Sequence, residues 1–192
     1  MPGAPIPENI STQLHDIAEK AASYPEMSFN NISYKIDTDL LHEAYRQTRK
    51  DGASGTDGVT AEEYAADLEE NLKNLHERLK TGRYKAPPVR RVWIDKEGGK
   101  QRPIGIPVFE DKIVQRAVVM VLNPIYEADF YPFSYGFRKG FSQHQALHDL
   151  RECCQKMNIS WIADADVSGY FDNIDHGILR ELINKRAVVH TE

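Results

Sequence analysis

The chain has 192 residues, of which 41% are hydrophobic and 28% are charged, proportions typical of a globular protein with its own core. The longest apolar stretch, residues 117–122, is too short to cross a membrane, and no basic segment followed by an apolar run indicates a secretory signal. Cys153 and Cys154 are the only cysteines, and sequence neighbours rarely pair with each other. We therefore expect a reducing, cytoplasmic setting and no membrane partner.

The net charge of −5 is unevenly distributed along the chain. Residues 1–80 hold 15 acidic against 8 basic side chains, whereas residues 83–102 hold 7 basic against 2 acidic ones, a local net charge of +5. A basic segment on an acidic chain indicates a place where phosphates bind. A solvated charged hairpin explains the same charges, and charge alone leaves both interpretations open.

Helical patterns dominate the N-terminal part of the chain. Residues 7–24 carry apolar side chains at helical spacing, and Asp37 or Thr38 is a candidate cap for a second helix. Residues 50–60 form a glycine-punctuated loop that leads into a third helix. Thr60 and Glu63 form a capping box there, and the apolar stripe continues to Leu79.

Two short alternating runs, residues 89–94 and 101–106, flank a Gly-Gly turn and predict a β-hairpin that carries the basic residues. Residues 108–126 predict a helix, and residues 130–141 predict an aromatic, glycine-rich loop. A helix capped by Ser142 follows and is expected to run to about residue 157.

An apolar run at residues 159–165 predicts a buried strand, and the chain after it predicts a last helix capped by Asp175. The order of helices, hairpin, helices, strand and helix indicates an α+β fold. Four carboxylates gather where the predicted strand ends, namely Asp164, Asp166, Asp172 and Asp175. Divalent cations prefer such oxygen ligands beside a phosphate substrate, although turns and helix caps use the same residues. For Asp175 we favour the cap, and for Asp166 both roles stay open.

Several motifs resemble those of group II intron-encoded reverse transcriptases. The first catalytic motif of that family is similar to Ala165-Asp-Val-Ser-Gly-Tyr-Phe-Asp-Asn-Ile-Asp-His176. The family's glycine-rich N-terminal loop, fingers hairpin, following helix and template-side segment resemble, in the same order, residues 52–60, 88–107, 111–116 and 133–140. The resemblance spans about residues 45–185. It implies a helical N-terminal extension (1–50), fingers with the basic hairpin (51–158) and the beginning of a polymerase palm (159–192).

The resemblance also implies roles for individual residues. Asp166 would be the catalytic Asp that binds two Mg²⁺ ions, with the carbonyl of Val167 as a further ligand. Phe171 would lie under the sugar of the incoming nucleotide and exclude a ribose 2′-OH. Arg90, Lys96 and Arg102 lie where the family contacts the dNTP, and Arg102 suits a bidentate phosphate contact.

Template contacts are implied for a second set of residues. Arg91 alternates with Arg90 and should face the other way, toward RNA. The remaining candidates are Gly55, Gly58, Gly136, Phe137 and Arg138. The glycines also serve turn geometry, and the aromatic residues around Phe137 are equally expected to pack under a loop, so both interpretations stay open.

The family's second carboxylate element, an aromatic-Ala-Asp-Asp turn, does not occur in these 192 residues. We therefore expect a two-metal site that is incomplete here and no polymerase activity from this chain alone. Three interpretations follow: a fragment of an RNA-directed DNA polymerase, a non-catalytic RNA-binding module, or one half of a split enzyme. The expected partners are RNA template and primer, including intron RNA, dNTP and a complementing downstream half. An unpaired edge in a partial palm would also allow self-association.

Overall fold

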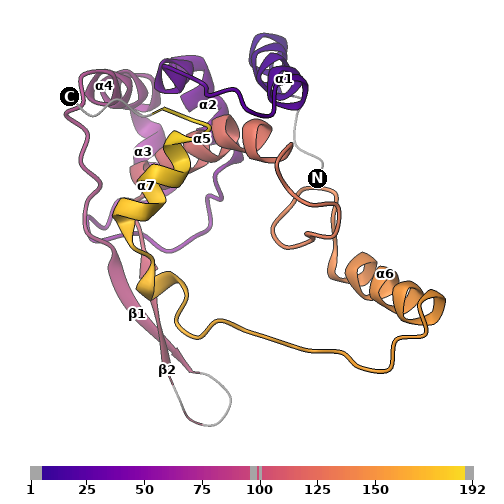
Figure 1. Ribbon diagram of the computed structural model, residues 1–192. Coiled ribbons are helices and arrows are strands. Elements are labelled where there is room, and N and C mark those ends of the chain that lie inside the picture. Colours follow the sequence, from indigo (N-terminus) through magenta and orange to yellow (C-terminus); the bar gives the residue numbers. More distant parts are fainter. Residues whose placement is uncertain (1–5, 96–98, 100, 189–192) are drawn as a thin grey trace.

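A computed structural model describes residues 6–95, 99 and 101–188 (Figure 1). Within these residues most of the helices gather above a two-stranded hairpin that projects from them, whereas one helix lies apart and a long extended segment leads from it back toward the others. In chain order the elements are α1 (Glu8–Ser23), the 3-10 helix η1 (Ile32–Lys35), α2 (Thr38–Gln47), α3 (Ala61–Ala66), α4 (Leu68–Lys80), β1 (Arg90–Asp95), β2 (Gln101–Ile106), α5 (Phe109–Tyr126), α6 (Gln143–Lys156), the 3-10 helix η2 (Phe171–Asn173) and α7 (His176–Asn184). The mixture of helices with one antiparallel hairpin confirms the α+β fold class.

Helix α5 is the centre of the core. Its buried side includes Ile113, Ala117 and Val121, which follow one another at helical spacing and pack in one cluster with residues of α1, α2 and α4. That cluster also contains Ala187, so residues from all three predicted regions share one core. The division of the chain at residues 50 and 158 stays a prediction. None of the helices in the described ranges is both long and apolar enough to span a lipid bilayer.

The predicted helix caps are confirmed, because each depends on a few adjacent residues. Asp37 accepts a hydrogen bond from the backbone N–H of Leu40, and Ser142 accepts one from Gln145. Thr60 and Glu63 form the reciprocal capping box at the start of α3.

The third predicted helix is interrupted. Asp67 leaves the helical conformation (φ −124°, ψ 42°) and separates α3 from α4. The Asn71 side-chain amide donates to the carbonyl of Tyr64, which compensates for the break in the helical ladder. The apolar stripe continues across the break, so periodicity alone predicted one helix.

The buried strand predicted at residues 159–165 is wrong. The chain is extended there but exposed, and among the described residues no strand pairs with it (Figure 1). Trp161 and Ile162 point largely into solvent. An apolar run becomes a strand only where a neighbouring strand supplies backbone partners, and a pattern in sequence does not reveal whether that neighbour is present.

Arg186 fastens the end of the described chain to the helical body. Its side chain is buried, and Nε donates to Asp129 at 2.9 Å. Nη1 donates to the carbonyl oxygens of Pro25 and Met27 at 2.5 and 2.8 Å. Phe29 and Ala187 form a parallel bridge beside it, so the segment after α7 is tied to the segment after α1.

We predict that Arg186→Met destabilises the chain by about 3–5 kcal/mol, because it leaves the Asp129 carboxylate and the carbonyls of Pro25 and Met27 without the buried donor that they share. Urea denaturation followed by circular dichroism measures the free energy of unfolding. Arg180→Met, on the exposed surface of α7, is the matched control and should change it by less than about 0.5 kcal/mol. Equal effects of the two substitutions would contradict an anchoring role for Arg186.

Candidate nucleotide and nucleic-acid site

The register of the hairpin divides its side chains between two faces. Because directly paired residues of antiparallel strands point to the same side, each face contains three residues from each strand. The Arg102 face consists of Arg90, Val92, Ile94, Arg102, Ile104 and Ile106. The Trp93 face consists of Arg91, Trp93, Asp95, Gln101, Pro103 and Gly105.

The structure thus brings Arg90 and Arg102 onto one face and places Arg91 on the other, as alternation predicted. All three arginines are exposed. Lys96, the third residue expected to contact the dNTP, lies outside the described residues.

The glycine-rich loop is held against the base of the hairpin and the start of α5. Arg90 Nε donates to the carbonyl of Ser54 at 3.0 Å, and Lys112 Nζ donates to the carbonyl of Ala53 at 2.6 Å. The Thr56 hydroxyl donates to the carbonyl of Pro88 at 3.0 Å. Arg90 therefore positions this loop in addition to the nucleotide contact expected of it.

Gly55 and Gly58 serve the loop in different ways. A Cβ on Gly55 would lie 2.5 Å from both Cα and N of Val108, so only glycine allows this approach to the start of α5. Gly58 has a positive φ of 75° and open space around it. Gly55 is thus required for packing, whereas Gly58 is required by its backbone conformation and stays open to a ligand.

Arg138 organises the loop that precedes α6. Its guanidinium donates to the carboxylate of Glu127 at 2.6 Å and to the carbonyl oxygens of Tyr131 and Ser134 at 3.0 and 2.6 Å. It also lies 4.2 Å from the centroid of the Phe141 ring. Only 8% of the Arg138 side chain is exposed, so it shapes this loop from inside.

Phe137 is exposed, in contrast to the enclosed side chain of Arg138. Its backbone adopts a positive φ of 58°, a strained conformation for an aromatic residue, and its ring is fully exposed. Gly136 beside it has no atom near the position that a Cβ would take. The ring of Phe137 therefore does not pack under the loop, and its contact with template stays a prediction.

The residues of the catalytic motif lie on an exposed stretch between α6 and α7. Asp166, Val167 and Phe171 are all exposed, and Phe171 begins η2. Asp175 accepts hydrogen bonds from Gly177 and Ile178 as the cap of α7, and these backbone N–H groups lower the pKa of its carboxyl. Its predicted role as a cap is confirmed.

The magnesium site that the motif implies is not assembled in the described residues. Within residues 6–95, 99 and 101–188, no three His, Cys, Asp or Glu side chains lie close enough together to hold a metal ion. Waters and substrate phosphates supply several of the roughly six oxygen ligands of each Mg²⁺, but a two-metal site needs carboxylates in addition to Asp166 and the carbonyl of Val167. The residues present therefore do not fit Mg²⁺ without further ligands.

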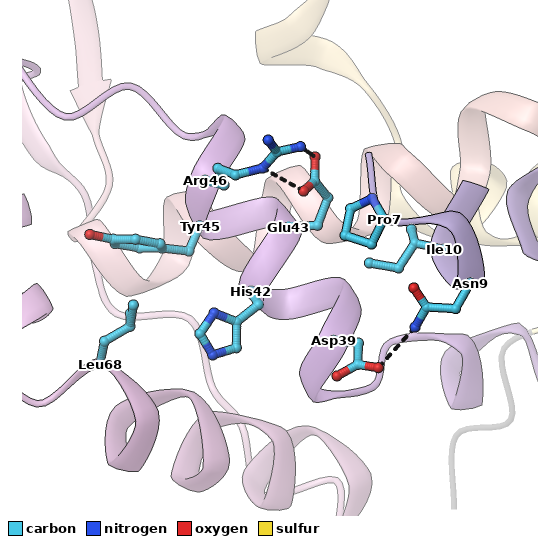
Figure 2. Close-up of a pocket in the computed structure, with 9 residues that line it drawn as sticks. All are labelled: Pro7, Asn9, Ile10, Asp39, His42, Glu43, Tyr45, Arg46 and Leu68. Atoms are coloured by element: carbon cyan, nitrogen blue, oxygen red, sulfur yellow. Dashed lines mark hydrogen bonds and ion pairs between the residues drawn. The ribbon is translucent and has the colours of Figure 1, made fainter. Parts of the chain in front are cut away.

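A pocket of about 500 Å³ lies elsewhere, between α1, α2 and Leu68 of α4 (Figure 2). None of the expected site residues lines it. Its polar side chains are already engaged, since Asn9 donates to Asp39 at 3.0 Å and Arg46 donates to Glu43 at 2.7 Å. Burial acts to raise the pKa of Glu43, but hydrogen bonds from Arg46 and Gln47 outweigh it and lower the pKa.

Sequence reasoning missed two residues of this site. Lys112 stands in the segment after the hairpin, but no sequence pattern places its ammonium against the glycine-rich loop. Trp93 shares the face of Arg91, and the same alternation that separated Arg90 from Arg91 would have placed it there.

Comparison with known proteins shows that the similarity extends beyond the motifs. A family model described as reverse transcriptase (RNA-dependent DNA polymerase) matches residues 94–191. Protein YkfC of Escherichia coli is 36% identical over 184 residues, which cover 92% of this chain and 48% of the relative. The group II intron-encoded protein LtrA of Lactococcus lactis is 38% identical over 152 residues, covering 79% of this chain and 25% of the relative.

A more distant relative, the nuclear intron maturase 1 of Arabidopsis thaliana, is 30% identical over 79 residues, covering 41% of this chain and 11% of that protein. The chain spans about half the length of the Escherichia coli relative and a quarter of that of the Lactococcus lactis relative. The chain belongs to the reverse transcriptase family and, within it, to the group II intron reverse transcriptases and maturases.

Proposed function

We propose that the chain supplies the fingers and the beginning of the palm of an RNA-directed DNA polymerase, and that it binds RNA template and primer, including intron RNA, together with dNTP. The observation that carries the proposal is the family match over residues 94–191, which includes Arg102, the Phe137 loop and Asp166. Residues 1–93 add the N-terminal extension and the glycine-rich loop at the base of the hairpin.

The Arg102 face is the proposed dNTP surface. A triphosphate needs positive groups over its β- and γ-phosphates as the leaving pyrophosphate gains charge. Arg90 and Arg102 share the face, and Lys96 follows β1 in sequence. Arg90 uses Nε to hold Ser54, and a guanidinium has further donors for phosphate oxygens. Phe171 would contact the sugar of the incoming nucleotide.

The proposed template surface combines Arg91 on the Trp93 face, the glycine-rich loop with Gly55 and Gly58, and the loop of Gly136 and Phe137. Phe137 supports the proposal most directly, because an exposed ring on a strained backbone contributes nothing to the core. Arg138 would act on template through the position of Phe137 rather than by touching RNA.

Asp166 is the proposed catalytic residue and would provide one carboxylate ligand for Mg²⁺, with the carbonyl of Val167 beside it. When bound, Mg²⁺ would neutralise charge on the triphosphate. Additional carboxylates must come from a region homologous to the rest of the longer relatives, joined to this chain or supplied by another one. Exposed apolar side chains around the motif, such as Trp161 and Leu182, support such an addition or self-association. The free thiols Cys153 and Cys154 agree with a reducing, cytoplasmic setting.

The role of Asp166 can be tested in a chimera in which this chain replaces the matching segment of the Lactococcus lactis relative. Asp166→Ala should lower primer extension on an RNA template by at least about 10³-fold, because a metal ligand is lost, while RNA affinity stays within twofold. Extension is measured with labelled primer and RNA affinity by fluorescence anisotropy.

Asp164→Ala is the matched control, since it removes an equal charge two residues away and should retain most of the extension. The isolated chain, residues 1–192, should bind RNA without extending a primer. Undiminished extension by the Asp166→Ala chimera would show that Asp166 is not catalytic and would favour the alternative of a non-catalytic RNA-binding module.

A substitution at Phe137 can separate an effect on RNA binding from an effect on stability. Asn tolerates a positive φ better than Phe does, so Phe137→Asn should leave the free energy of unfolding unchanged or raise it by up to about 1 kcal/mol. Affinity for single-stranded RNA should fall by about tenfold, because a stacking surface is lost. Urea denaturation and fluorescence anisotropy provide the two measurements.

Tyr34→Asn is the matched control for this experiment. Tyr34 in η1 is exposed to 71% and belongs to none of the motifs, so its replacement should leave RNA affinity unchanged. If Phe137→Asn destabilised the chain and left RNA affinity intact, the ring would be a packing residue.

A further inference from the structure

The two faces of the hairpin differ in what covers them. On the Arg102 face the side chains of Val92, Ile104 and Ile106 are half-buried. All six residues of the Trp93 face are exposed. The hairpin also projects from the helical body, as Figure 1 shows, and the exposed residues of the Trp93 face are distributed along both strands.

Small neighbours keep the indole of Trp93 accessible. Trp93 is 55% exposed, and its cross-strand partner Pro103 adds only a compact ring. Gly105 lies opposite Arg91, and a Cβ there would lie 2.8 Å from Cγ2 of Val89. The exposed side chain of Val89 occupies that space, so an apolar strip with one guanidinium in it continues from Val89 to Trp93.

The size of the face indicates what kind of partner fits it. Two paired strands of six residues present about 200 Å² of flat surface, given a rise of about 3.4 Å per residue and a strand spacing of about 5 Å. A specific protein interface buries about 800 Å² of accessible surface on each partner, so a protein bound here would have to contact surfaces beyond the hairpin. One nucleobase with its phosphate requires far less surface than a protein does.

The chemistry of the face agrees with a nucleotide. Arg91 and Trp93 stand two residues apart on one strand, so their Cα atoms are about 7 Å apart. This spacing lets an aromatic plane stack on a base while the guanidinium meets an adjoining phosphate. Asp95 is the one acidic residue of the face, and it accepts a hydrogen bond from Gln101 at 2.9 Å at the end of the strands away from Arg91.

We propose that the Trp93 face binds single-stranded RNA, with Trp93 stacking on an unpaired nucleobase and Arg91 contacting the adjoining phosphate. The inference rests on the proposed function, since it assumes that the chain binds RNA, and it adds Trp93 as a contact residue. Every base has a π face, so binding at Trp93 tolerates sequence, whereas paired bases within a duplex are not available to it.

Intrinsic fluorescence tests the stacking directly, because the chain has two tryptophans, Trp93 and Trp161. Trp161→Phe leaves Trp93 as the single indole. Titration of this variant with a labelled 12-nucleotide oligouridine should quench Trp93 fluorescence in step with the rise in anisotropy. A double-stranded RNA of the same length should bind with little quenching.

Variants measured by anisotropy provide the energetic test. Trp93→Ala should weaken binding of oligouridine by about tenfold, and Trp93→Phe by less than about threefold, because a smaller ring still stacks. Arg91→Gln should reduce the slope of log affinity against log salt by about 0.7, the value for one phosphate contact on a single strand. Tyr34→Ala, which truncates an exposed aromatic ring in η1 away from both faces of the hairpin, is the matched control and should change affinity by less than twofold.

Each remaining outcome overturns the inference in a distinguishable way. If oligouridine binds but Trp93 is not quenched and Trp93→Ala binds normally, RNA uses another surface, and the proposed function stands without this contact. If no RNA binds at all, the proposed function and the inference fail together. If Trp93 fluorescence changes with protein concentration in the absence of RNA, and Trp93→Ala removes that change, the face is an interface between two copies of the chain.

Discussion

The buried side of α5 packs against α1, α2 and α3, and the position of the candidate site depends on this packing. At the first turn of α5, the Phe109 ring meets the rings of Tyr45 and Tyr64 edge-on. Lys50 lies over the Tyr45 ring at 3.6 Å, and its burial there lowers the pKa of its ammonium group. The chain that leaves this cluster becomes the glycine-rich loop, and the chain that enters α5 comes directly from β2. One aromatic cluster thus fixes both the loop and the base of the hairpin.

The second half of the chain is organised differently. Within the described residues, no hydrophobic residue between 126 and 185 is buried, so α6, η2 and α7 contribute little to the core. Their caps and local hydrogen bonds are intact, whereas their apolar side chains face solvent. Arg186 and the Phe29–Ala187 bridge hold the far end of this region to the helical body. The stretch that carries the predicted catalytic motif therefore lies between α5, which is part of the core, and the segment anchored by Arg186, and core residues do not pack beneath it.

This division explains which features could be predicted from the sequence. Caps at Asp37, Ser142 and Asp175 depend on residues within one turn, so they were predicted correctly even where nothing packs on the helix. The hairpin and the separation of Arg90 from Arg91 follow from alternation over a few residues. The prediction of a strand at 159–165 failed because a strand requires a partner strand, and the local sequence does not show whether one is present. The interruption of the helix at Asp67 was not predicted, because the apolar residues keep their helical spacing across it.

Long-range polar contacts were the features least accessible to sequence reasoning. The buried guanidinium of Arg186 donates hydrogen bonds to carbonyl groups about 160 positions earlier in the chain, and no local pattern predicts these contacts. The same holds for Lys112 and the glycine-rich loop. The roles expected of Asp166 and Phe171 rest on family resemblance, because the geometry of these exposed side chains does not reveal a function.

The residues of the candidate site therefore fall into two physical kinds. Arg138 and Gly55 are engaged within the protein, one by carbonyl groups and ring faces and the other by the backbone of Val108. The rings of Phe137 and Trp93 are exposed and do not belong to the core cluster. Replacing a residue of the first kind alters RNA binding by moving the loop, and should lower stability as well. Replacing one of the second kind removes contact surface alone. Stability measured beside affinity distinguishes the two, because a change in affinity with unchanged folding can come only from residues that the fold does not need.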